Sequence, residues 1–180
     1  MQNTLWIFVI TLATLRAGEL AAQDKVSTGS EERLKTAQKL LDDAIAESVK
    51  RLGKQQCAKL FGPEALDAVH RTDFRIVSFG PPVMREGRPV VSAAKTLPNH
   101  KMVLINLDGP FVNTQILIGG KLENFARVQP RTKSVALSQE DIRVAIILHE
   151  LGHVLGKFGP DTKNIDDSHA HTDSVIQHCF

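Results

Sequence analysis

Residues 138–161 read SQEDIRVAIILHELGHVLGKFGPD, and the first part of this stretch has the apolar spacing of an amphipathic helix. Ser138, with Asp141 three residues later, matches a capping box and predicts where that helix begins. His149 and His153 are four residues apart, so they project from the same face of a helix. Two imidazoles held in this way can bind one Zn²⁺ through nitrogens at about 2.0–2.1 Å. The stretch therefore predicts a helix with a metal-binding face.

The five residues His149-Glu150-Leu151-Gly152-His153 form the pattern HExxH, and on this motif the chain resembles the zincin metallopeptidases. Gly156 extends the likeness to metzincins, in which a glycine allows the sharp turn that brings a third ligand back to the metal. The resemblance implies a zincin-like fold, a bound Zn²⁺ and hydrolysis of peptide bonds. It also implies that Glu150 is the catalytic base, because its carboxylate can take a proton from water activated by the metal.

The third metal ligand is the point at which the chain departs from the metzincin pattern. Gly159 stands where metzincins carry that ligand, and glycine has no side chain to offer. Asp161 is the first choice, with His169, His171 and Asp173 as alternatives. Gly-Pro-Asp is also ordinary turn chemistry, so Asp161 as a plain turn residue stays open. The methionine turn of metzincins is absent as well, because all three methionines precede the motif.

A second resemblance covers the chain from about Cys57 to Phe180. This part is similar to small exported bacterial proteins that share HELGH, FGPD and a terminal Cys-Phe. The likeness implies a single exported domain and brings no known substrate with it.

Residues 5–15, LWIFVITLATL, have the length of the apolar region of a signal peptide and are too short to span a bilayer comfortably. The small residues Ala21 and Ala22 predict cleavage after Ala22. We therefore expect a signal peptide at 1–22, a single domain at 23–180, and a secreted or periplasmic protein. The first four residues carry no lysine or arginine, so an uncleaved anchor or a buried N-terminal helix is the alternative.

The chain has two cysteines, Cys57 and Cys179. An even number of cysteines in an exported chain predicts a disulfide bond, whereas a reducing compartment would leave two free thiols. The two residues are too far apart in sequence for the CxxC spacing of a redox or zinc site.

Composition narrows the range of partners. The chain has 180 residues, 42% of them hydrophobic, which is enough for one core. Its formal charge of +2 favours neither nucleic acid nor a membrane surface as a partner. We expect a monomer that acts on a peptide or protein, with no nucleic-acid partner and no stable membrane span after signal cleavage.

The remaining patterns predict an α+β fold. An apolar stripe predicts a helix over about 31–52, and two further N-terminal helices are expected, one over Cys57 to Phe61 and one that begins at Pro63. A short C-terminal helix is expected over 168–178. Stretches rich in β-branched residues over 73–126 predict four or five strands in a small, mainly antiparallel sheet, with a hairpin about Gly119-Gly120. By the zincin resemblance, one of these strands lines the substrate cleft.

Two other classes of function remain open. One is an exported metal-binding protein without catalysis, which four protein ligands and no water would indicate. The other is an exported interaction module in which HExxH is incidental.

Overall fold

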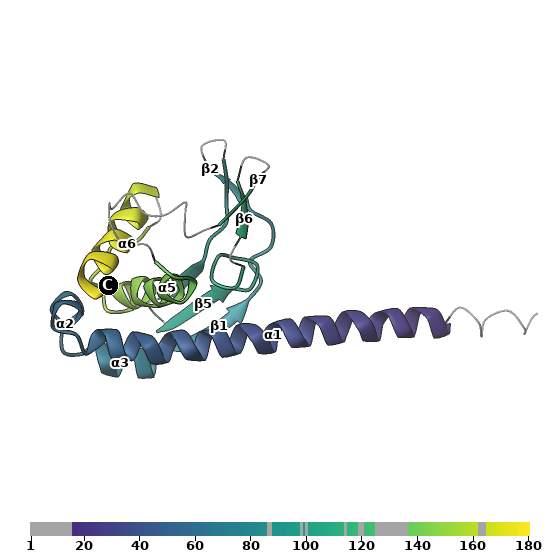
Figure 1. The fold of residues 1–180 in the computed structure, drawn as a ribbon, viewed down its shortest axis with the longest axis horizontal. Coiled ribbons are helices and arrows are strands. Elements are labelled where there is room, and N and C mark those ends of the chain that lie inside the picture. Colours follow the sequence, from purple (N-terminus) through teal and green to yellow (C-terminus); the bar gives the residue numbers. More distant parts are fainter. Residues whose placement is uncertain are drawn as a thin grey trace, which may run out of the picture. The chain divides into compact units, whose positions relative to one another are not determined.

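The computed structural model describes residues 16–85, 88–97, 99, 101–113, 115–118, 121–124, 137–161 and 165–180. Within these residues the fold is α+β, with five helices, a small three-stranded sheet and two β-ribbons (Figure 1). None of these helices is long and apolar enough to cross a bilayer. The predicted apolar region at 5–15 lies outside the described residues. The helices are α1 (Arg16–Leu52), α2 (Gln55–Phe61), α3 (Ala65–Arg71), α5 (Gln139–Val154) and α6 (Ile165–Cys179).

The first helix, α1, is longer than its apolar stripe predicts. It begins at Arg16, so the expected start near Glu31 is wrong. The added segment has no proline and contains several good helix formers, so local propensity allows the helix to extend. The chain divides into two compact units, one that ends at Thr36 and one that begins at Ala37. In the second unit α1 buries its stripe, which includes Ala37, Leu41, Ala44 and Leu52.

The three-stranded sheet has the order β1-β5-β4 and is mixed. β1 (Asp73–Val77) pairs in parallel with β5 (Met102–Asn106), and β4 (Ala94–Leu97) pairs with β5 antiparallel. The pairing of β1 with β5 therefore departs from the expected, mainly antiparallel arrangement, whereas the pairing of β4 with β5 agrees with it. The reason is the long connection between β1 and β5, since parallel neighbours need a crossover and cannot be joined by a tight turn.

The two β-ribbons are both antiparallel. β2 (Val83–Arg85) pairs with β3 (Arg88–Val90), and β6 (Gln115–Ile118) pairs with β7 (Lys121–Asn124). The second pairing confirms the predicted hairpin, although Gly119 and Gly120 themselves lie outside the described residues.

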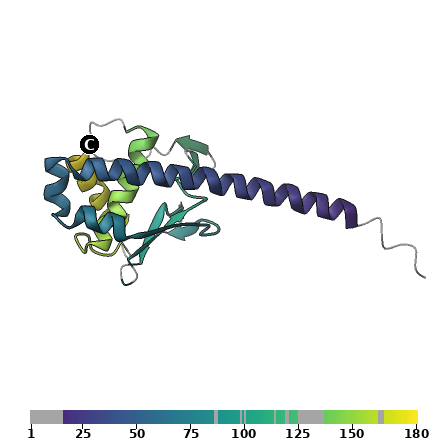
Figure 2. The same ribbon diagram turned by 90° about the horizontal axis from the view of Figure 1, so that it is seen from below.

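Helix α5 lies between α6 and the sheet, as the two views in Figures 1 and 2 show. Toward the sheet it contributes Ile147 to a buried cluster with Leu41, Val103, Ile105 and Phe111. Toward α2, α3 and α6 it contributes Leu148 and Leu151 to a second cluster with residues such as Phe61 and Val175. The capping box at its start is confirmed, because Ser138 Oγ accepts from the Asp141 N–H and the Asp141 carboxylate accepts from the Ser138 N–H. Packing on both sides thus holds the HExxH helix in place.

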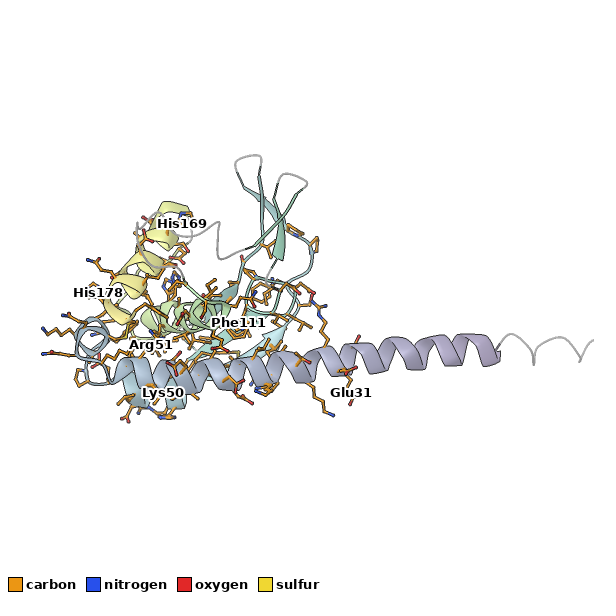
Figure 3. All side chains as sticks on the ribbon, in the orientation of Figure 1. Glu31, Lys50, Arg51, Phe111, His169 and His178 are labelled. Atoms are coloured by element: carbon orange, nitrogen blue, oxygen red, sulfur yellow. A yellow bond between two sulfur atoms is a disulfide. The ribbon has the colours of Figure 1, made fainter. Side chains whose placement is uncertain are left out.

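The C-terminal helix α6 is attached to the body at its last turn. A disulfide joins Cys57 of α2 to Cys179, which confirms the predicted pairing. Arg51 of α1, labelled in Figure 3, forms an ion pair with Asp141 of α5 at 2.8 Å, and its guanidinium lies over the Phe180 ring at 4.4 Å from the centroid. The body therefore holds the end of α6 by the disulfide, by a hydrogen bond from the Arg51 guanidinium to the Cys179 carbonyl at 3.3 Å, and by the contact of Arg51 with Phe180.

Candidate metal centre

The two histidines of the HExxH motif lie one helical turn apart on α5, as predicted. Their Nε2 atoms are 3.0 Å from one another, and their ring centroids are 4.8 Å apart. Both side chains are largely removed from solvent, with exposed fractions of 8% for His149 and 10% for His153. The helix therefore presents two imidazole nitrogens at a single buried point.

The turn that follows α5 brings the chain back toward these histidines. Gly156 has φ +67°, a conformation in which a side chain is disfavoured. Its N–H donates to the His153 carbonyl at 3.1 Å, and the Lys157 N–H donates to the Gly152 carbonyl at 2.9 Å. These two hydrogen bonds form a Schellman motif. The chain then reverses, and Asp161 Oδ2 lies 2.9 Å from His149 Nε2 and 3.3 Å from His153 Nε2.

Helix α6 adds a third histidine to the group. Nδ1 of His171 lies 2.9 Å from Oδ1 of Asp161. One ligand atom from each of four residues, His149, His153, Asp161 and His171, lies within 4.8 Å of the other three, so these residues could hold a metal ion.

Of the four residues considered as third ligand, Asp161 and His171 belong to this group, whereas His169 and Asp173 do not. His169 lies toward the opposite end of α6 from His178 (Figure 3). Its Nδ1 is buried and has no hydrogen-bond partner within the described part of the chain. The candidates for the third metal ligand are therefore Asp161 and His171.

Thr172 fixes the tautomer of His149. The Thr172 hydroxyl donates its only proton to the Ser168 carbonyl at 3.0 Å, so it must accept at its 3.0 Å contact with His149 Nδ1. His149 therefore carries a proton on Nδ1, and Nε2, which faces His153 and Asp161, is its nitrogen that can bind a metal. A hydrogen bond of this kind to the outer ring nitrogen is usual for histidines that bind metals.

The electrostatics of the group favour a positive charge at its centre. Burial opposes ionisation of Asp161, but its hydrogen bonds with His149, His153 and His171 outweigh this and hold the pKa of its carboxyl well below the usual range. Burial also disfavours the charged form of His153, yet the hydrogen bond with Asp161 raises the pKa of that imidazole above its ordinary value. A carboxylate and two imidazole nitrogens at this spacing attract either a proton or a metal ion, and metal binding would release the proton.

Glu150 is buried beside the edge strand of the sheet. Its side chain accepts a hydrogen bond from the Thr96 hydroxyl of β4 at 2.5 Å, and only 7% of the residue is exposed. Burial is the main reason why the pKa of this carboxyl is raised. Glu150 is not one of the four grouped ligand residues. Glu150 is therefore a carboxylate beside the candidate metal centre, and it is held by Thr96, which precedes it by 54 residues in the chain.

The ring of Phe158 connects the turn after α5 with His171. It stacks on the His171 imidazole with centroids 4.6 Å apart and planes 6° apart. The Phe158 ring also lies so close to Gly152 that a Cβ on this glycine would be 2.2 Å from the ring. Gly152 thus permits a close approach of Phe158 to α5, and Phe158 in turn supports His171.

Replacing Gly152 with alanine is expected to displace Phe158 and disturb the candidate metal centre. The added methyl group overlaps an aromatic ring in a packed region, and such overpacking typically costs about 1–3 kcal/mol of unfolding free energy. Urea unfolding and metal titration would measure the two effects. Gly159→Ala is the matched control, because nothing lies within 4 Å of a Cβ at that position. Equal stability and metal affinity for the two variants would contradict this role of Gly152.

Sequence reasoning did not find Thr96, Thr172 or Phe158 as supports of the site. Thr96 and Thr172 are distant from their partners in sequence and match no motif. A signal did exist for Phe158, because a glycine inside a helix, such as Gly152, often marks a close approach of another group.

The fold and the four converging side chains define an α+β protein with a candidate metal centre of three histidines and one aspartate. No protein-family model, no curated protein and no solved structure matches this chain.

Proposed function

We propose that this protein is an exported zinc metallopeptidase in which His149, His153 and Asp161 bind Zn²⁺ and Glu150 is the catalytic base. The observation that carries the proposal is the convergence of the two HExxH histidines with Asp161, while the glutamate of the same motif is buried next to them. The zincin resemblance of the motif supplies the reaction class.

The donor atoms fit a tetrahedral zinc ion. Bonds of about 2.0–2.1 Å place the donors of a tetrahedral zinc site about 3.3 Å apart. The three separations among His149 Nε2, His153 Nε2 and Asp161 Oδ2 are 2.9, 3.0 and 3.3 Å. Imidazole nitrogen and carboxylate oxygen are both common zinc ligands, and the contact of His149 Nδ1 with Thr172 leaves Nε2 as the nitrogen that would bind the ion.

A bound zinc ion would supply Lewis-acid chemistry, because it lowers the pKa of water and polarises a carbonyl group. Glu150 would accept the proton of the attacking water and pass it to the leaving amine. The Thr96 hydroxyl, by donating to Oε2, would hold the Glu150 carboxylate in one orientation. Burial favours a proton on this carboxyl, which suits a group that must both accept and return one.

The strand that supports Glu150 also favours an extended peptide as the substrate. β4 is at one edge of the sheet β1-β5-β4, and its Thr96 touches Glu150. An edge strand has backbone groups that can pair with an extended peptide. A peptide bound along β4 would therefore pass beside the catalytic carboxylate, as the zincin resemblance implies for one strand of the sheet.

Export is supported by the apolar stretch at 5–15 and by the disulfide between Cys57 and Cys179. Disulfides persist mainly in oxidising compartments such as the periplasm and the cell exterior. In this proposal cleavage follows Ala22 and the domain 23–180 is the secreted or periplasmic enzyme.

A second candidate function is a metal site without catalysis. The observation in its favour is His171, one ring nitrogen of which lies within 4.8 Å of the ligand atoms of the other three residues. Four protein ligands would complete a tetrahedral zinc site and leave no position for water, as in structural zinc sites.

Metal analysis of the purified protein tests the proposal. We expect about one zinc per chain, the stoichiometry of a three-ligand catalytic site, and hydrolysis of a peptide library that depends on it. His153→Ala should lose both the zinc and the hydrolysis. His70→Ala is the matched control, because His70 is exposed on α3 and lies outside the group of ligands.

A wild-type protein that takes up no zinc when zinc is supplied would reject the proposal. Zinc binding without hydrolysis of any library peptide would favour the second candidate function.

A further inference from the structure

The two carboxylate oxygens of Asp161 have different partners. Oδ2 faces the HExxH histidines, at 2.9 Å from His149 Nε2 and 3.3 Å from His153 Nε2. Oδ1 contacts His171 Nδ1 at 2.9 Å. The oxygen that His171 contacts is therefore not the oxygen that completes the triangle of close donor atoms.

We propose that His171 is a positioning residue, which donates its Nδ1–H to Oδ1 of Asp161 and turns Oδ2 toward the metal without binding the metal itself. The inference rests on the proposed function and concerns the same site.

The direction of this hydrogen bond follows from the chemistry of the two groups. An aspartate is ionised at neutral pH and can then only accept hydrogen bonds. His171 Nδ1 must therefore carry the proton in its contact with Asp161. While it carries this proton, Nδ1 has no lone pair for a metal. Unlike the Nε2 atoms of His149 and His153, it also faces the outer oxygen Oδ1 and not the oxygen Oδ2 that completes the triangle.

Stacking on Phe158 holds the His171 ring in this position. Phe158 stacks on one face of the imidazole, with the planes 6° apart. The Phe158 ring in turn lies against Gly152, where there is no room for a side chain. The turn after α5 therefore sets both the place of Asp161 and the orientation of the ring that hydrogen-bonds to it.

This arrangement keeps the fourth coordination position open. With His149, His153 and Asp161 as the three protein ligands, the fourth position remains for water or substrate, as catalytic zinc requires. A hydrogen bond to the second oxygen of a ligating carboxylate fixes its orientation, and loss of such an outer contact commonly lowers metal affinity about 10–100-fold.

Two substitutions separate a positioning role from a ligand role. In His171→Asn the side-chain amide nitrogen is attached at Cγ, as Nδ1 is in histidine, so it can donate the same hydrogen bond, whereas a neutral amide nitrogen does not coordinate zinc. His171→Ala removes both abilities. We expect zinc affinity, measured by competition with a chelator, to fall about 10–100-fold in His171→Ala and to be largely restored in His171→Asn. An equal loss in both variants would overturn the proposal.

A second measurement uses Co²⁺ as the probe. Its visible absorption spectrum reports how many protein ligands bind the metal, and no peptide substrate is needed. If three residues bind the metal, added imidazole should occupy the open position and change the visible absorption spectrum of the wild-type Co²⁺ protein. If imidazole leaves the wild-type spectrum unchanged but alters that of His171→Ala, then His171 is a ligand and the proposal is wrong.

The outcomes for the two proposals can be told apart. Asparagine rescue and imidazole binding without peptide hydrolysis would support the role of His171 and reject the peptidase. Failure of the wild-type protein to bind either Zn²⁺ or Co²⁺ would overturn both. Far-UV circular dichroism would establish that each variant is folded. If His171→Ala does not fold, the comparison of His171→Asn with the wild-type protein still tests the proposal.

Discussion

Replacing Glu150 with glutamine is expected to lower peptide hydrolysis by about 10²–10⁴-fold, the usual contribution of a general base, while zinc stays bound. The amide keeps the size of the carboxylate, and its oxygen can still accept the hydrogen bond from Thr96. It cannot take a proton from the attacking water. Initial rates on a peptide substrate, together with zinc content, measure the two parts of this prediction.

Glu140→Gln is the matched control for this experiment. Glu140 is in the first turn of the same helix and is exposed, so its replacement should change neither hydrolysis nor zinc content. If Glu150→Gln binds zinc and retains full activity, Glu150 is not the base.

Removing the disulfide is expected to cause the largest loss of stability. Cys57 and Cys179 are separated by 122 residues, and removal of a native disulfide typically costs about 2–5 kcal/mol of unfolding free energy. Both residues are buried in an apolar cluster, so the double variant Cys57→Ala/Cys179→Ala avoids burying new polar groups. Urea unfolding of this variant should show a lower midpoint than that of the oxidised wild type.

Wild-type protein reduced with a phosphine is the control, because it loses the bond but keeps both side chains. Since α6 carries His171 and Thr172, loosening its attachment should also weaken zinc binding. An unfolding curve of the double variant that coincides with that of oxidised wild type would show that Arg51, which contacts Asp141 and Phe180, is sufficient to hold the end of α6.

The HExxH helix could be predicted in detail because its determinants are local. The capping pair Ser138 and Asp141 lies within the first turn, and the two histidines share a face through helix geometry alone. The turn at Gly156 is also encoded locally, by a residue that tolerates positive φ. For the same reason the hairpin of β6 and β7 was predicted, since its strands are neighbours in sequence.

Predictions were less accurate where the structure depends on contacts between distant segments. The start of α1 was placed too late, because an apolar stripe shows where a helix packs and not where it begins, and the residues before Glu31 also favour a helix. The parallel pairing of β1 with β5 was missed, because strand direction in a sheet depends on how intervening segments cross the fold.

The sequence by itself determined the helix, the shared face of its two histidines and the turn at Gly156 that follows it. Only the tertiary structure decided that His171 and Thr172 of α6 reach this group, and that Thr96 of β4 holds Glu150. The physical reason is the distance along the sequence between the residues that make each contact. Hydrogen bonds within one helix or turn follow from local backbone geometry, whereas the contacts of α6 and β4 exist because hydrophobic packing and a disulfide bring separate segments to the two sides of α5.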